Sequence, residues 1–121
     1  MRLYRCSKVD QFLYEERLVD ERKLWCYAQM KASSDNDLNS YYGLVLVCIK
    51  LDRLFIFVSR FNDVELELFC SCAISEMKCI RTKKGWMSTR LSFSVDNRHI
   101  QLDLDDWKRL SVGLAPSDMR Q

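Results

Sequence analysis

The central part of the chain is built from short runs in which apolar and polar residues alternate. The run 64–69 alternates strictly, and Leu91, Phe93 and Val95 fall on one face of the run 87–95. Alternation with a period of two is typical of strands that have one buried face. Short polar connections separate the runs, which favours antiparallel neighbours. The pattern therefore predicts seven antiparallel strands, over 24–32, 43–50, 54–60, 64–69, 77–83, 87–95 and 100–104.

A helical period appears before the first strand. Val9, Phe12, Leu13 and Val19 fall near one face, and charged residues lie largely on the other. This spacing is typical of an amphipathic helix. We therefore expect a helix over residues 8–22.

A second helical pattern follows the last strand. Asp105 is a candidate N-cap, and the apolar residues Trp107 and Leu110 follow it. Gly113 and Pro116 then provide a stop signal. The sequence thus predicts a C-terminal helix that starts near Asp105.

The run 44–49 is apolar on both faces, with Leu44, Leu46 and Cys48 on one face and alternate residues on the other. A strand of an antiparallel sheet usually exposes one face, so the second face needs a cover. The N-terminal helix is one candidate cover. A second copy of the chain is the other.

The order of elements resembles the pleckstrin-homology (PH) superfold, in which seven antiparallel strands precede a C-terminal helix. Residues 42–57, Tyr-Gly-Leu-Val-Leu-Val-Cys-Ile-Lys-Leu-Asp-Arg-Leu-Phe-Ile-Phe, are similar to the Gly-containing second and third strands of bacterial PH-like and GRAM-like domains. Ile80, Lys83, Lys84 and Gly85 are similar to the segment that follows there. The resemblance covers residues 24–114, and Cys48 stands where these domains commonly have Thr.

The resemblance implies a mainly β fold of the α+β class, with two near-orthogonal sheets in a partly open barrel. The C-terminal helix would cap this barrel, so we expect Trp107 and Leu110 to pack into its end. It also implies a bacterial source and a non-catalytic binding module. The domain division is a helix over residues 1–23 and a PH-like domain over 24–121.

Length and composition agree with one compact domain. The chain has 121 residues, of which 48% are hydrophobic and 30% charged, with a net charge of +2. A core of this size is sufficient for a stable domain without disulfides or a metal. The first ten residues lack the apolar stretch of a signal peptide, so we expect a cytoplasmic protein.

Charge is distributed unevenly along the chain. Residues 1–77 hold 10 basic and 12 acidic side chains, whereas residues 78–121 hold 9 and 5. The excess of basic residues is concentrated in the predicted hairpin around Gly85, which also carries an aromatic residue at its tip. We take this hairpin as the candidate binding surface, formed by Lys78, Arg81, Lys83, Lys84, Trp86 and Arg90.

The partner class follows from these charges. A protein partner or self-association is the leading expectation, and a peripheral membrane adaptor that binds acidic lipid headgroups is the alternative. In PH domains that bind phosphoinositides, the basic residues lie around the loop after the first strand. The corresponding loop here, 33–40, contains Asp35 and Asp37 and has no basic residue, so the resemblance disfavours lipid. A net charge of +2 is weak for a nucleic-acid partner, and we expect none.

Catalytic and cofactor chemistry have little support in the sequence. His99 is the single histidine, and nothing in the spacing gives it a nucleophile, so a polar turn residue is the favoured interpretation. Cys70 and Cys72 would share a strand face and could bind zinc with Cys79 and His99, but a second closely spaced ligand pair is missing. We expect reduced thiols, with Cys48 and Cys79 in apolar surroundings, and neither enzyme activity nor a metal or small-molecule cofactor.

Overall fold

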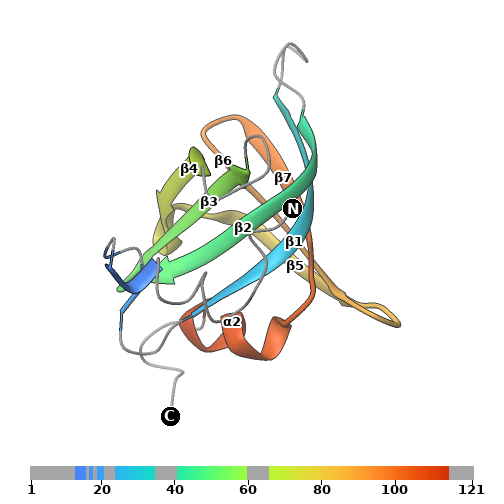
Figure 1. The fold of residues 1–121 in the computed structure, drawn as a ribbon. Helices are drawn as coiled ribbons and strands as arrows, with labels where there is room; N and C mark the ends of the chain where they lie inside the picture. The colour runs from blue at the N-terminus through green and yellow to red at the C-terminus, as the bar shows by residue number, and fades with distance from the viewer. Residues whose placement is uncertain are drawn as a thin grey trace.

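A computed structural model describes residues 13–15, 17, 19–20, 24–34, 41–59 and 66–114. The described chain forms seven antiparallel strands and a C-terminal helix (Figure 1). The strands are β1 (Trp25–Ser34), β2 (Tyr41–Lys50), β3 (Arg53–Ser59), β4 (Leu66–Ala73), β5 (Lys78–Lys84), β6 (Thr89–Val95) and β7 (Arg98–Leu104). The helix is α2 (Trp107–Leu114), and a 3-10 turn, η1 (Ile74–Glu76), connects β4 to β5.

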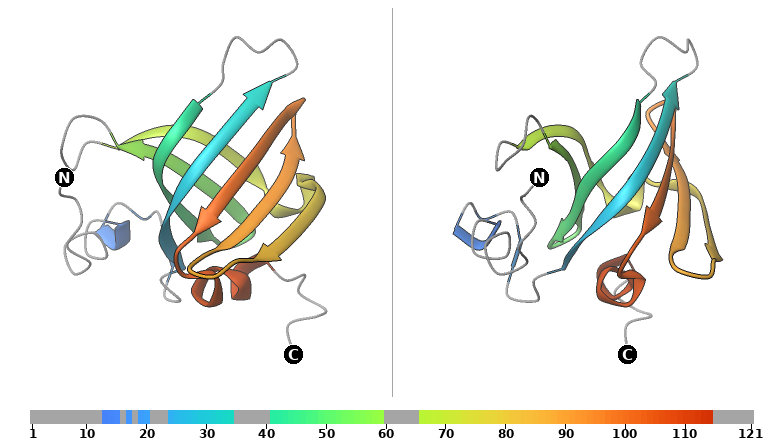
Figure 2. Two further views of the ribbon diagram at one scale, coloured as in Figure 1. Left: turned by 90° about the vertical axis from the view of Figure 1, so that its right-hand side faces the viewer. Right: turned by 45° about the vertical axis from the view of Figure 1, so that its right-hand side comes forward.

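All seven strands belong to one sheet with the order β4-β3-β2-β1-β7-β6-β5. The sheet is continuous because β1 pairs with β2 along one edge and with β7 along the other. The sheet curls into a half-barrel, and α2 lies at one end of it (Figure 2). The predicted mainly β fold, with its seven antiparallel strands and C-terminal helix, is confirmed.

The core fills the concave side of the sheet. The side chains of Val47, Ile56, Phe93 and Leu102 are fully buried there. Leu110 of α2 is also fully buried in this core, and Trp107 is half-buried against it. The helix therefore closes one end of the half-barrel, as predicted, although Trp107 keeps part of its surface in solvent.

A second buried cluster lies on the other face of β2 and β3. Leu13 and Val19 from the N-terminal segment pack there with residues of the sheet that include Leu46, Cys48 and Phe57. Leu13 is fully buried and Val19 is 3% exposed. This packing confirms that the N-terminal segment covers the outer apolar face. Phe12, which was predicted to share this role, lies outside the described residues.

The predicted N-terminal helix over 8–22 is too long. Residues 13–15 are helical, but Arg17 has a φ of 60° and residues 19–20 are not helical. A left-handed residue cannot continue a right-handed helix. The chain turns there, and Val19 reaches the sheet. Two hydrogen bonds join this turn to the end of β2 and the residue that follows it. Lys50 Nζ donates to the Arg17 carbonyl at 2.7 Å, and Leu51 N donates to Asp20 Oδ2 at 3.3 Å.

The start of α2 also differs from the prediction. Asp106, and not Asp105, caps the helix, because its Oδ1 accepts a hydrogen bond from Arg109 N at 3.2 Å. Asp105 instead continues the sheet, since its backbone N–H donates to the Tyr27 carbonyl at 3.2 Å. Gly113, interpreted as a stop signal, is buried inside the last turn of α2.

Candidate functional site

The predicted basic hairpin is formed by β5 and β6, and β5 is an edge strand of the sheet. All seven residues of β5 are exposed, whereas four of the seven residues of β6 are buried. The hairpin projects beyond the body of the sheet at its 85–88 loop (Figure 1). Strand β5 therefore offers both its backbone edge and its side chains to a partner.

A β-bulge arranges the basic side chains of β5. Lys78 pairs with Ser94 and Arg81 pairs with Ser92, so that Cys79 and Ile80 together oppose a single residue of β6. Cys79 adopts a φ of 56°, the left-handed conformation expected within such a bulge. Lys78 and Arg81 are three positions apart and would face opposite sides of a regular strand. The bulge places both on the outer face.

Further charges lie on the same outer face. Lys83 pairs with Arg90 of β6, and Arg90 Nε forms an ion pair with Asp103 Oδ1 at 2.9 Å. The hydrogen bond that Arg90 donates to Asp103, and the negative charge of Asp103, raise the pKa of Arg90. Lys31 of β1 joins this face through the register of β1, β7 and β6. We call this group the basic face; it comprises Lys31, Lys78, Arg81, Lys83 and Arg90.

The other two predicted residues lie elsewhere. Lys84 pairs with the buried Thr89 and therefore faces the opposite side of the hairpin from Lys83. It borders a groove of about 460 Å³ between the hairpin loop and the start of α2. Trp86 is in the loop and is 94% exposed, next to Met87 at 78%. The predicted set thus divides into the basic face, Lys84 on the opposite side of the hairpin, and Trp86 in an apolar tip.

Sequence reasoning missed Lys31 and the separation of Lys83 from Lys84. Lys31 joins the face only because β1 pairs with β7, a contact between distant parts of the chain. The bulge at Cys79 carries no glycine that would have marked it. The predicted acidic loop is largely outside the described residues, which include only Ser33 and Ser34 of it.

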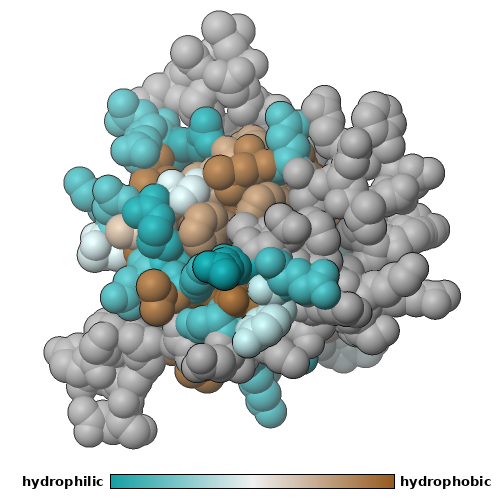
Figure 3. Space-filling view, turned by 60° about the vertical axis from the view of Figure 1, so that its left-hand side comes forward, coloured by the Kyte–Doolittle hydropathy of each residue, from teal (hydrophilic) through white to brown (hydrophobic). Residues whose placement is uncertain are grey.

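The side of the molecule that carries β3 and β4 has a different character. Figure 3 shows hydrophobic patches there that are interspersed with hydrophilic side chains. Leu68 of β4 is 50% exposed. The β3–β4 side is therefore mixed in polarity, whereas the basic face gathers exposed cations, with Asp103 as the acidic neighbour of Arg90.

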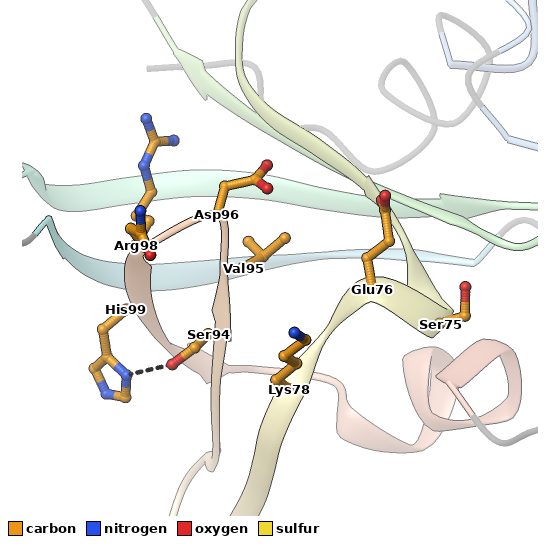
Figure 4. A pocket seen from close by; sticks show the side chains of 9 residues that line it. Ser75, Glu76, Lys78, Ser94, Val95, Asp96, Arg98 and His99 are labelled. Atoms are coloured by element: carbon orange, nitrogen blue, oxygen red, sulfur yellow. Dashed lines mark hydrogen bonds between the residues drawn. The ribbon is translucent and has the colours of Figure 1, made fainter.

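His99 lies in β7, and not in the predicted turn, which consists of Asp96 and Asn97. Its ring Nδ1 is 3.3 Å from Ser94 Oγ, and both side chains are solvent-accessible. Figure 4 shows that the His99 ring points away from Asp96 and Glu76, which border an open groove of about 780 Å³. This arrangement gives the ring a hydroxyl neighbour without bringing those two carboxylates to it.

The described cysteines, Cys26, Cys48, Cys70, Cys72 and Cys79, are free thiols, and Cys6 lies outside the described residues. Burial raises the pKa of Cys26 and of Cys48 to about 12. The prediction for Cys79 is wrong, because this side chain is exposed on the bulge. Within the described ranges, His, Cys, Asp and Glu do not form a group of three or more that could bind a metal, so Cys70, Cys72, Cys79 and His99 are not assembled into a zinc site.

A comparison of the chain with protein-family models and with curated proteins gave no match. Among the described residues, no helix has the length and apolar character needed to cross a membrane.

Proposed function

We propose that this chain is a non-catalytic binding module of the PH-like class that acts through contacts with an acidic protein partner. The observation that carries the proposal is the basic face on an edge strand whose seven residues are all exposed. Side chains of one sign favour a partner of opposite charge, and electrostatic attraction increases the rate of encounter. The strand order and the helix at the end of the half-barrel support the PH-like part of the proposal.

The β5 edge adds a second means of recognition. A partner segment in extended conformation can pair with the free backbone groups of an exposed edge, and side chains on alternate positions then supply specificity. Lysines on an edge strand also prevent unwanted pairing between identical chains. An acidic segment would neutralise the charges of Arg81 and Lys83. Such a segment could therefore pair with the β5 edge, whereas a basic or identical chain would be repelled.

The test compares two neighbouring lysines on opposite faces. Lys83→Glu reverses a charge on the basic face, whereas Lys84→Glu reverses one on the other side of the same hairpin. We expect partner recovery from an extract of the native cells to fall at least tenfold for Lys83→Glu and to change little for Lys84→Glu. Binding should also weaken as salt approaches physiological strength, where the screening length is about 8 Å.

Equal binding by wild type and both variants would contradict the proposal. The melting temperature of each variant provides the control for folding, because exposed charge changes usually alter stability by less than about 0.5 kcal/mol. Sedimentation of the purified chain measures self-association separately. A salt-sensitive dimer that Lys83→Glu abolishes would identify a second copy as the partner.

A peripheral membrane adaptor is the second candidate, and the exposed loop tip favours it. Trp86 and Met87 are apolar side chains that project beside basic residues. Tryptophan is enriched at the interface between lipid headgroups and water. Cosedimentation with vesicles of neutral or acidic lipid tests this candidate: acidic vesicles must bind the wild type, and Trp86→Ala must reduce that binding.

A further inference from the structure

Two cysteines lie on the concave side of β4, away from the basic face. Cys70 pairs with Ile56 and Cys72 pairs with Leu54, and both partners are core residues. Residues two apart on a strand share a face, so the two thiols are neighbours. Cys72 is 2% exposed, while Cys70 is only half-buried. Solvent molecules therefore reach Cys70 more readily than Cys72.

Arg98 approaches this pair from the other half of the sheet. Its guanidinium carbon is 4.8 Å from the centre of the Phe69 ring, and Phe69 precedes Cys70. Strand β4 is the first strand of the sheet and β7 the fifth, so no strand ladder joins them. The curl of the sheet brings Arg98 across the concave side. A cation stacked on an aromatic ring is thereby held beside a thiol.

The charges around the two thiols have opposite effects on them. The neighbouring Cys72 thiol and the positive charge of Arg98 lower the pKa of Cys70 to about 7. Burial and the negative charge of Asp96 oppose this shift. The adjacent Cys70 sulfur, burial and the negative charge of Glu76 raise the pKa of Cys72, against the charge of Arg53. One thiol thus holds the proton and the other forms the thiolate.

We propose that Cys70 is a thiolate nucleophile that hydrogen peroxide oxidises to a sulfenic acid, with Cys72 as its hydrogen-bond donor and Arg98 as its counter-ion. The inference goes beyond the proposed function and does not depend on it. Thiolates that are accessible and accompanied by a cation are the cysteines that react selectively. Buried Cys26 and Cys48 lack these conditions, because burial keeps them protonated.

The proposed step balances as follows. The Cys70 sulfur attacks one oxygen of hydrogen peroxide, the O–O bond breaks, and the second oxygen leaves as hydroxide. The hydroxide takes a proton from solvent and becomes water. The sulfur is oxidised to the sulfenic acid, and the peroxide is reduced. Arg98 stabilises the anionic sulfur before the attack and thereby raises the fraction of thiolate at neutral pH.

The first measurement is the pH dependence of alkylation in the full chain. The Cys79→Ser variant removes a second accessible thiol, and peptide mapping assigns iodoacetamide adducts to individual cysteines. We expect the alkylation rate of Cys70 to rise with pH and to show an inflection near pH 7, because the pKa of this thiol is lowered to about 7. An inflection at the free-thiol value of about 8.5 would overturn the proposal.

Two variants test the roles of the neighbours. Cys72→Ala removes the hydrogen-bond donor, and Arg98→Gln removes the cation, so each should move the Cys70 inflection to higher pH. Arg81→Gln is the matched control, because it removes a cation from the basic face on the far side of the sheet. Unchanged inflections in both variants would overturn the assignment. If both variants fail to fold, the pH dependence of Cys70 alkylation in the chain with wild-type Cys72 and Arg98 still tests the proposal.

The second measurement is peroxide treatment in the presence of a dimedone-type probe that traps sulfenic acids. We expect the adduct on Cys70 at neutral pH, and a reduced yield in Arg98→Gln under the same conditions. An adduct on Cys79 with Cys70 unmodified would overturn the proposal. These readouts are independent of binding through the basic face, so this inference and the proposed function can fail separately.

Discussion

At the scale of single residues, Gly113 shows how closely α2 approaches the sheet. A Cβ atom at this position would be 2.7 Å from Leu24 Cδ1 and 3.0 Å from Ile49 Cγ2. The Leu24 contact involves the end of a flexible side chain, which can move, but Ile49 presents two atoms at 3.0–3.1 Å. The absence of a side chain at Gly113 therefore permits the helix to lie against β1 and β2.

Gly113→Ala should lower the free energy of unfolding. Overpacking a core costs about 1–3 kcal/mol. The better helix propensity of alanine offsets about 1 kcal/mol of this cost. Urea unfolding measures the difference, with Lys108→Ala as the control on the exposed side of α2. A gain in stability for Gly113→Ala would mean that the helix can move away from the sheet at little cost.

The residues predicted correctly from sequence are those whose role follows from local pattern. Cys48 and Leu110 are buried because they continue an apolar face. Gly113 and Cys79 were misinterpreted because their roles depend on contacts with other elements. Gly113 lies where α2 meets the sheet, and Cys79 lies in a bulge where two residues of β5 oppose one residue of β6. Hydrophobic pattern reports which face is buried, but it carries no information about such contacts.

At the scale of elements, the N-terminal segment is stabilised by the sheet that it covers. Among its described residues, 13–15 are helical and 17, 19 and 20 are not. Short isolated helices are marginal in water, so this segment depends on tertiary packing. Leu13 and Val19 are buried against β2 and β3, while Tyr14 is 53% exposed. The apolar period in the sequence correctly identified the buried face, although tertiary packing shortened the helix.

Leu13→Ala should destabilise the protein by about 2–5 kcal/mol, the usual cost of truncating a fully buried leucine. Tyr14→Ala changes the adjacent, exposed residue and should cost much less. Chemical unfolding compares the two variants, and gel filtration detects association caused by an uncovered outer face. Equal and small losses in both variants would show that the segment does not contribute to the fold.

At the scale of the whole molecule, the predictable part is the order of elements and the unpredictable part is the curl. Seven alternating runs and a terminal helix could be identified locally, and antiparallel neighbours followed from short connections. The pairing of β1 with β7 and the approach of Arg98 to Phe69 depend on how the sheet assembles and curls. For this reason the Cys70–Cys72 pair and the basic hairpin were identified from the sequence, but Lys31 and Arg98, which approach them from other strands, were not.

The buried thiols of Cys26 and Cys48 make the stability of the whole fold sensitive to alkaline pH. Cys26 and Cys48 have folded-state pKa values of about 12, because burial disfavours their charged forms. An unfolded thiol has a pKa of about 8.5. Below that value both states bind the proton and stability is unaffected. Between the two values the unfolded state releases protons that the folded state keeps, so stability falls as pH rises.

Each buried thiol should therefore lower the free energy of unfolding by about 1.4 kcal/mol for every pH unit between roughly pH 9 and 12. Urea unfolding at several pH values across this range gives the slope. Cys48→Ala should reduce the slope by the contribution of one thiol, even though the substitution also lowers stability at every pH. Cys79→Ala removes an exposed thiol and should keep the wild-type slope. An unchanged slope in Cys48→Ala would mean that solvent reaches this thiol in the folded protein, and the cover formed by Leu13 and Val19 would then be loose.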